Sequence, residues 1–318
     1  MIIVRLMGGL GNQLQQYALY RHIEECGLEA ALDTNWFDSE NQKSVLAIRE
    51  IEIDKFPKIR YKKAIQSEID KLTGGSSVLG KIKRRFFKDS IHVCNEDSRI
   101  FVDSLYSGLF VNRSIKDLYI EGYFANEFYY TDVLPILREE LSFPIEESRN
   151  CGKLSELASA MSSGDSISIH LRRGDYLDSV NFDGFKDICT DEYYSSALGL
   201  ALENANAPVV YIFSDDPEYA REYVSKLSSM VDRTFEAVVV DINRGEDSFF
   251  DMYLMSCCRI NIVANSTFSF WGARLNSHED KIMIRPTIHH NKQIFEYENM
   301  KKWWKNWVFV SPKGEVFR

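Results

Sequence analysis

A regular alternation of short apolar runs with amphipathic segments fills the second half of the chain and constrains its fold more than any other feature. The apolar runs predicted as strands are 167–172, 208–213, 236–241, 259–263 and 281–284. The segments predicted as helices between them are 191–204, 217–228, 247–257 and 268–276. Strands that are joined by helices run parallel, and a parallel sheet is covered by helices on both faces. We therefore expect an α/β fold with a Rossmann-like domain in this half.

The first half begins with the same alternation and then becomes less regular. Its predicted elements are strand 2–7, helix 14–26, strand 29–32, strand 117–124, and helix 127–141 with Pro135 near its middle. The polar segment 142–166 separates this half from the second. We expect two domains, 1–150 and 151–318, and leave open whether the C-terminal tail packs back on the first.

Composition and charge exclude several classes of protein. The 318 residues include 38 Lys and Arg against 47 Asp and Glu, a formal net charge of −9, so we expect no nucleic-acid partner. The N-terminus has no basic leader and no apolar run near the ~20 residues that a membrane span needs, which predicts a cytoplasmic protein. The six cysteines show no metal-site spacing and are expected to be reduced thiols.

The sequence MGGLGNQ, residues 7–13, lies between the first predicted strand and helix. Its glycines allow a ligand to approach the backbone, and the N-terminus of the following helix favours a phosphate group. With Asp33 at the end of the next strand, Gly9 and Gly11 also suit a dinucleotide-binding loop, but Leu14 stands where the third glycine is required. A ligand loop and a simple turn both remain open, and a dinucleotide-dependent oxidoreductase remains an alternative function.

A second motif, ISIHLRRGDYLD (167–178), ends the first strand of the second half. Ligands of open α/β sheets bind at the carboxyl ends of strands. His170 and Arg172 share one face of an otherwise apolar strand, where a polar pair without a task would be costly. Arg172 and Arg173 point to opposite sides, so one can bind a phosphate bidentately while an acid such as Asp175 holds the other.

Two further predicted strands end in polar motifs. FSDDP places two acids before a helix, and Asp216 can cap that helix. Asp215 is then left to accept hydrogen bonds from the N–H groups of a guanine edge. ANSTFSF places three hydroxyls at another helix start, a second candidate anion site, although capping accounts for one of them. These hydroxyls belong to Ser266, Thr267 and Ser269. The chain contains no Asp-x-Asp, the paired acid of many metal-dependent sugar-nucleotide transferases, so we expect no metal cofactor.

Together these segments resemble the bacterial alpha-1,2-fucosyltransferases of polysaccharide synthesis. The resemblance rests on GGLGNQLQQYA, EGYFANEFYY, HLRRGDY, FSDDP and NSTFSFWGA, in the family's order and spacing across essentially the whole chain. It implies a GT-B architecture, with two Rossmann-like domains facing across a cleft, of which the C-terminal one holds GDP-fucose and the N-terminal one offers the acceptor. It also implies metal-independent, inverting transfer of L-fucose from GDP-β-L-fucose to a galactoside hydroxyl of a glycan. The alternatives are another fucosyl linkage and a non-enzymatic nucleotide-sugar or carbohydrate-binding module.

Carried over by position, the resemblance implies roles for individual residues. Arg172 would bind the β-phosphate of the donor and stabilise the departing GDP. His170 and Asp215 would contact guanine, and Arg173 would belong to the same donor site. The remaining donor contacts would be Gly11, Asn12 and Gln13 from the N-terminal domain and Ser266, Thr267 and Ser269 from the C-terminal domain.

The motifs do not fix the general base that would take the proton of the acceptor hydroxyl. Asp175 is the first candidate, and Glu121 and Asp178 follow. An oxocarbenium-like transition state can also proceed with little help from a base, because the hydroxyl becomes acidic late in the reaction.

Two stretches mix cations with aromatic rings, KIKRRFFK (81–88) and MKKWWKNW (300–307). This composition predicts weak peripheral attachment to an anionic membrane, near a lipid-linked acceptor. The alternative is a solvated helix face and a tail that its tryptophans anchor to the fold.

Overall fold

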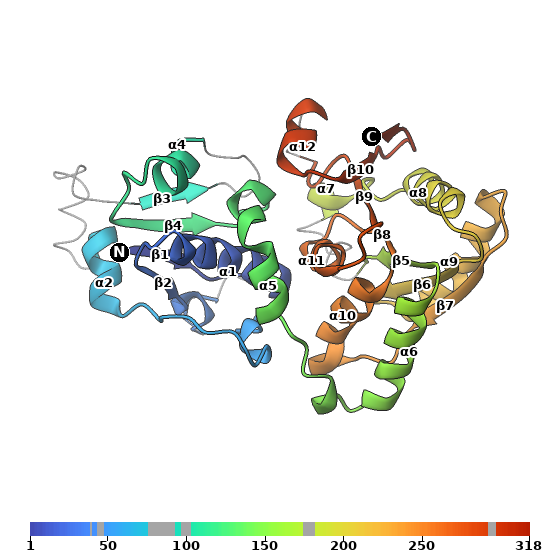
Figure 1. Cartoon of the computed structure of the whole chain (residues 1–318), viewed down its shortest axis with the longest axis horizontal. Coiled ribbons are helices and arrows are strands. Elements are labelled where there is room, and N and C mark those ends of the chain that lie inside the picture. The colour runs from blue at the N-terminus through green and yellow to red at the C-terminus, as the bar shows by residue number, and fades with distance from the viewer. Residues whose placement is uncertain (39, 43–47, 76–92, 97–102, 174–181, 292–296) are drawn as a thin grey trace. The chain divides into compact units, whose positions relative to one another are not determined.

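The structure is a computed structural model (Figure 1). It describes residues 1–38, 40–42, 48–75, 93–96, 103–173, 182–291 and 297–318. Contacts divide the chain into two compact units, Met1–Ser142 and Phe143–Arg318. The division falls at the start of the polar segment 142–166, ahead of the expected boundary at residue 150.

The first unit is built on a four-stranded sheet with the strand order β2-β1-β4-β3, in which every pairing is parallel. Its strands are β1 (Ile2–Arg5), β2 (Ala30–Asp33), β3 (Val93–Glu96) and β4 (Leu118–Gly122). Its α-helices within the described residues are α1 (Leu10–Glu25), α2 (Gln66–Thr73), α4 (Asp103–Tyr106) and α5 (Leu134–Glu140). The chain goes from β1 to β2 on one side and later to β3 and β4 on the other. The strand order therefore reverses between β1 and β4, which is where ligands of open α/β sheets bind.

The single helix predicted over 127–141 is wrong. The structure instead has two short 3-10 turns, Glu127–Tyr129 and Thr131–Val133, before α5 begins. Pro135 lies in the first turn of α5 and not near the middle of a helix. Proline has no N–H to donate and fits that first turn, where the N–H groups have no intrahelical partner.

The second unit is a seven-stranded sheet with the order β11-β10-β9-β8-β5-β6-β7, parallel except for the β10–β11 pair. Its strands are β5 (Ser166–Leu171), β6 (Val209–Ser214), β7 (Glu236–Val240), β8 (Ile260–Ile262), β9 (Ile282–Pro286), β10 (Trp307–Val310) and β11 (Val316–Phe317). Its described α-helices are α6 (Cys151–Ser163), α7 (Phe182–Phe185), α8 (Asp191–Glu203), α9 (Pro217–Met230), α10 (Phe250–Cys257), α11 (Thr267–Leu275) and α12 (Tyr297–Trp303). The predicted alternation and the α/β fold of two Rossmann-like units are confirmed.

Helices cover both faces of this sheet, as a parallel sheet requires (Figure 1). The apolar side chains of β5, β6, β8 and β9 pack with those of α8 and α9 in one core. The other face is covered by α10 and α11, which pack on each other, and α6 packs on α10. The described part of the C-terminal tail, which the sequence left without predicted strands, adds β10 and β11 to the sheet. Strand order reverses between β5 and β8, which marks the expected ligand-binding edge of this unit.

Candidate functional site

The carboxyl ends of β5 and β6 bring an arginine and an acid together. The register pairs Leu171 with Ser214, so Arg172 and Asp215 follow side by side. Arg172 Nη1 lies 2.9 Å from Asp215 Oδ2, and Asp215 Oδ1 accepts a hydrogen bond of 3.0 Å from the backbone N–H of Arg173. Both carboxylate oxygens of Asp215 therefore hold the arginine loop, and the partly exposed Arg172 guanidinium is oriented at the edge of the sheet.

Arg173 takes a different environment. Its guanidinium carbon lies 3.7 Å from the centre of the Tyr219 ring, and its Nε lies 3.4 Å from Asp216 Oδ2. Asp216 also caps α9 by accepting a hydrogen bond from the N–H of Tyr219. The acid beside Arg173 is thus Asp216, whereas Asp175 and the weaker base candidate Asp178 lie outside the described residues.

His170 is the most buried titratable residue of this edge, with 5% of its surface exposed. Its ring centre lies 6.1 Å from that of Phe268 in α11, and its Nδ1 has no hydrogen-bond partner among the described residues. Burial, and to a lesser extent the charge of Arg172, lowers the pKa of His170 to about 3. The imidazole is therefore neutral near pH 7 and has a free nitrogen for a ligand.

The N-terminus of α11 lies across the strand-order reversal from His170 and has free donors. Within the described residues, the N–H groups of Thr267, Phe268 and Ser269 make no hydrogen bond, and neither do the hydroxyls of Ser266 and Thr267. Ser269 is buried, and its hydroxyl donates to the carbonyl of Ser266 at 3.3 Å. Free N–H groups at a helix N-terminus attract an anion, and here they lie at the ligand-binding edge.

The glycine-rich loop of the first unit is different, because its own side chains fill it. Gln13 is fully buried. Its Nε2 donates to the carbonyls of Gly8 and Glu50, and its Oε1 accepts from the N–H groups of Glu52 and Ile53. All four hydrogen-bonding positions of this amide are used inside the unit, so Gln13 ties the loop to residues 50–53.

The N-terminus of α1 is also occupied by protein groups. The N–H of Leu10 donates to Glu52 Oε2 at 3.0 Å, and the N–H groups of Asn12 and Gln13 donate to the carbonyl of Gly9. A carboxylate thus occupies the place at this helix end that a dinucleotide phosphate would need. Gly11 is buried in the same first turn, and Asn12 is half-buried.

A further functional candidate, Asp251 in the first turn of α10, was not identified from the sequence. Burial raises the pKa of its carboxyl to about 7, although a hydrogen bond of 2.7 Å from Asn243 Nδ2 opposes this shift. Asn243 is buried, and its Oδ1 has no partner among the described residues. Both residues follow the carboxyl end of β7, next to β6. The signal in the sequence was one acid within the apolar run FFDMYLM.

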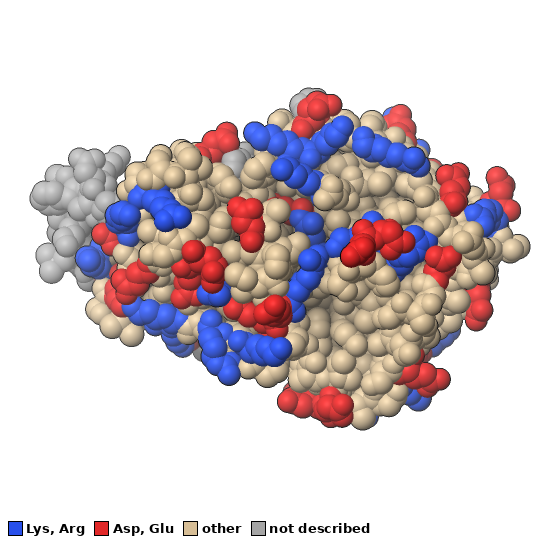
Figure 2. Space-filling model, viewed as in Figure 1, with Lys and Arg blue, Asp and Glu red and all other residues tan. Residues whose placement is uncertain are grey.

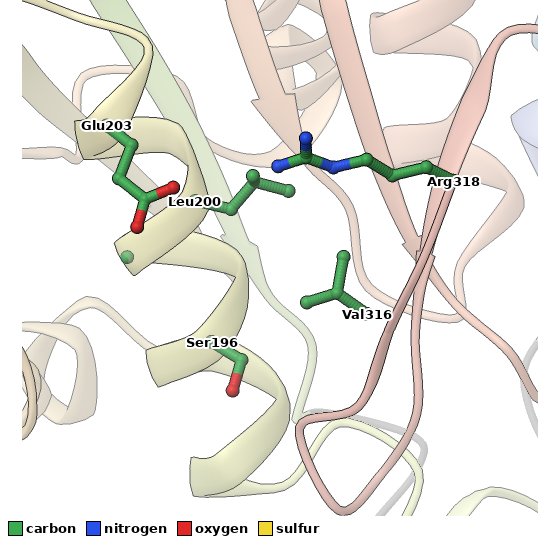
Figure 3. Close-up of a pocket in the computed structure, with 6 residues that line it drawn as sticks. Ser196, Leu200, Glu203, Val316 and Arg318 are labelled. Atoms are coloured by element: carbon green, nitrogen blue, oxygen red, sulfur yellow. The ribbon is translucent and has the colours of Figure 1, made fainter.

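Three other features would bear on function: a metal site, a membrane-spanning helix and a surface groove. In those residues no three His, Cys, Asp or Glu side chains are grouped so that they could hold a metal ion. Of the helices described, none has the length and apolar character needed to cross a membrane. A shallow groove of about 550 Å³ lies between α8 and the β10–β11 hairpin (Figure 3) and contains none of the predicted site residues. It is lined by Ser196, Gly199, Leu200, Glu203, Val316 and Arg318.

Comparisons by sequence with known proteins match this chain to glycosyltransferases. The model of glycosyl transferase family 11 matches residues 82–311. An alpha-1,2-colitosyltransferase of Escherichia coli is 30% identical over 90% of this chain and 91% of its own length. The O-antigen biosynthesis glycosyltransferase WbnK of the same organism is 29% identical over 88% of this chain and 92% of its own. A galactoside 2-alpha-L-fucosyltransferase of Caenorhabditis elegans is 23% identical over 70% of this chain and 61% of its own.

Proposed function

Because the chain belongs to glycosyl transferase family 11, and is therefore a glycosyltransferase, we propose that it is an inverting alpha-1,2-fucosyltransferase. It moves L-fucose from GDP-β-L-fucose to a galactoside hydroxyl of an O-antigen or capsule-type glycan, in the cytoplasm. The observation that carries this proposal is the pair formed by Arg172 and the free N-terminus of α11, at the strand-order reversal of the second sheet. Family membership and the carboxylate at the start of α1 both disfavour the oxidoreductase alternative.

The donor's pyrophosphate fits the groups at this edge. The N–H groups of Thr267, Phe268 and Ser269 would donate hydrogen bonds to one phosphate, and Arg172 would donate to the other. As the bond from C1 of fucose to the β-phosphate oxygen breaks, negative charge grows on that oxygen. Arg172, held in place by Asp215, would stabilise this charge by ~3 kcal/mol or more, which needs no metal ion.

Recognition of guanine would fall to Asp251 and Asn243, which follow the carboxyl end of β7. The N1–H and N2–H groups of guanine are two adjacent donors, and the free oxygen of Asn243 and the carboxylate of Asp251 are acceptors. Asp215, the acceptor predicted from the sequence, already uses both oxygens for the arginine loop. Asp251→Asn should therefore weaken GDP binding more than ADP binding, measured by calorimetry.

The acceptor hydroxyl attacks C1 from the face opposite to the leaving GDP, and its proton must be taken up. Asp175 remains the first candidate base. Glu121 is less suited, because the guanidinium of Arg5 lies 2.8 Å from its carboxylate.

One incubation tests the function. The protein is mixed with GDP-fucose and lactose in EDTA, and the product is analysed by NMR. We expect an alpha-1,2-linked fucoside with release of GDP. If no fucoside forms and the donor alone releases no GDP, the proposal is contradicted. A product that forms only with added divalent metal would contradict metal independence.

A colitosyl donor is the second candidate, because a relative with that name aligns with 90% of this chain. Both donors are therefore offered in competition, and the product ratio gives the preference. If the product is mostly colitoside, the protein is still a glycosyltransferase, but its donor sugar is colitose and not fucose.

Peripheral membrane contact is a separate part of the proposal. Figure 2 shows lysine and arginine side chains gathered over α12, where Lys301, Lys302 and Lys305 are exposed. Trp304 and Trp307 are buried, and the Arg285 guanidinium lies 4.2 Å from the Trp304 ring, so these tryptophans anchor the tail. Within the described residues, attachment would therefore depend on these lysines; the other basic stretch, 81–88, lies outside them. Co-sedimentation with anionic vesicles that is absent, or unchanged when the three lysines become glutamine, would contradict it.

A further inference from the structure

A row of four polar side chains crosses the whole sheet of the first unit at its carboxyl edge. Strand register places Arg5 beside Asp33, and Asn95 beside Glu121. The β1–β4 register pairs Val4 with Ile120, so Arg5 and Glu121 are the next neighbours. Side chains at neighbouring register positions of a sheet point to the same face. The polar row is therefore Asp33, Arg5, Glu121 and Asn95, in that order across β2, β1, β4 and β3.

An ion pair and hydrogen bonds hold the Arg5, Glu121 and Asp33 side chains of the polar row in place. Arg5 Nη1 lies 2.8 Å from Glu121 Oε1. Asp33 is buried and accepts from the Tyr119 hydroxyl at 2.7 Å and from the N–H of Asn35 at 2.9 Å. The opposite charges of Arg5 and Glu121 shift the pKa of that Tyr119 hydroxyl in opposite directions, although burial and Asp33 raise it overall.

The exposed end of the polar row has hydrogen-bonding capacity to spare. Asp33 is 4% exposed, whereas the Arg5 and Glu121 side chains are 26% and 36% exposed and Asn95 is exposed. Beyond their ion pair, the described structure records no further partner for the other donors of Arg5 or the second oxygen of Glu121. Donors and acceptors thus alternate at short spacing on an open surface.

The polar row also lies where the strand order of this sheet reverses. The ion pair of Arg5 with Glu121 bridges β1 and β4, and the strand order reverses between these two strands. In open α/β sheets this is the place where ligands bind. The glycine-rich loop at the same edge is filled by Gln13 and Glu52, so it leaves the ligand position to the polar row.

We propose that the polar row is the subsite for the acceptor saccharide, with Arg5 and Glu121 as its specificity-determining residues. This inference rests on the proposed function and names the surface that binds its acceptor. Neighbouring hydroxyls of a pyranose each donate and accept a hydrogen bond, so they match a guanidinium next to a carboxylate and an amide. A nucleotide would place phosphate against the carboxylates of Glu121 and Asp33, which disfavours a second donor site here.

The first test measures saccharide binding without transfer. Saturation-transfer NMR with lactose is recorded on the wild-type chain, on Arg5→Gln and on Glu121→Gln. We expect each variant to bind lactose about tenfold more weakly or worse, since a hydrogen bond to a charged group is lost. The ion pair of Lys62 with Glu29, 3.0 Å apart and more exposed, supplies the control variant Lys62→Gln, whose binding stays unchanged. Equal lactose binding in all variants, or none by the wild type, would overturn the proposal.

A charge swap separates binding from a merely structural ion pair. The double variant Arg5→Glu with Glu121→Arg keeps an ion pair between β1 and β4 but reverses its polarity. We expect the melting temperature to stay near that of the wild type while the KM for lactose rises about tenfold and the KM for GDP-fucose does not change. An unchanged KM for lactose would show that the pair is structural. Slow GDP release from GDP-fucose without lactose depends only on the proposed function. If the wild-type chain releases no GDP in this assay, that result counts against the proposed function and not against the polar row.

Discussion

The N-termini of α1 and α11 occupy equivalent places in the two units, but within the described residues only that of α11 has free N–H groups. Both helices follow a parallel strand through a short loop at a strand-order reversal. In the first unit, Glu52 accepts from the N–H of Leu10, and the carbonyl of Gly9 accepts from the N–H groups of Asn12 and Gln13. In the second, the N–H groups of Thr267, Phe268 and Ser269 make no hydrogen bond within the described structure. A helix start that looks suited to phosphate is therefore a site only if the protein leaves its donors free.

The largest expected effect concerns the arginine beside the free helix start. Arg172→Ala should lower the rate of transfer by about 10²- to 10³-fold, because the charge on the departing phosphate loses a preorganised donor. Circular dichroism should be unchanged, since this side chain is partly exposed. Arg149→Ala is the matched control, because that arginine is 78% exposed on the same unit. A transfer rate within a few fold of the wild type would contradict the assignment of the phosphate to Arg172.

The second effect tests whether the glycine-rich loop is mainly structural. Gln13→Ala leaves two carbonyls and two N–H groups without partners in a part-buried place, which should cost about 2–4 kcal/mol. Urea denaturation of the variant measures the loss of stability, and GDP affinity under native conditions should remain near that of the wild type. The control Gln66→Ala removes an exposed amide from α2 and should be nearly neutral. A stable Gln13 variant that fails to bind GDP would instead place Gln13 in the donor site.

The third effect is a pH dependence in the second unit. His170 has a pKa of about 3 when folded, against 6.5 as the ordinary value, so protonation favours the unfolded chain. Its neutral form is fully compatible with folding above about pH 6.5, and stability is lost as the pH falls from there towards 3. At pH 5 the loss should be about 2 kcal/mol. Urea denaturation of the wild type and His170→Gln at pH 7 and pH 5 checks this, since the variant should lose less. Parallel losses in both proteins would show that His170 does not titrate in this way.

The smallest effect concerns the carboxylate at the start of α1. Glu52→Gln keeps an acceptor for the N–H of Leu10 but removes the negative charge, which should cost about 0.5–1 kcal/mol. Thermal unfolding measures this change, and GDP affinity should stay constant. Tighter GDP binding by the variant would indicate that the carboxylate had been excluding phosphate from a usable site.

Much of the fold follows from the sequence because short apolar runs and helical periodicity are local signals. The alternation from β5 to β9 was predicted close to its observed bounds. The helix across 127–141 was not, because three-residue turns and a proline in the first turn of α5 leave the same apolar spacing. Strand β10 was missed because its tryptophan was assigned to a basic and aromatic surface stretch. Its burial depends on pairing with β9, which is a tertiary contact.

The candidate site was only partly predictable for a related reason. The motifs placed His170, Arg172 and Asp215 at one edge, because carboxyl ends of parallel strands meet there. Which oxygen Asp215 gives to which donor depends on the geometry of two neighbouring loops. A conspicuous amide such as Gln13 was assigned to the ligand, although its partners lie about forty residues away in residues 50–53. Asp251 could not be identified from the sequence, since a single acid in an apolar helix forms no recognisable motif.

Amide hydrogen exchange with and without GDP tests the central claim most directly, because it reports on the two helix starts in one experiment. We expect GDP to slow exchange at the N–H groups of Thr267, Phe268 and Ser269 and to leave that of Leu10 unchanged, since Glu52 already holds it. Protection at the start of α1 with none at the start of α11 would show that the donor phosphate does not bind at α11.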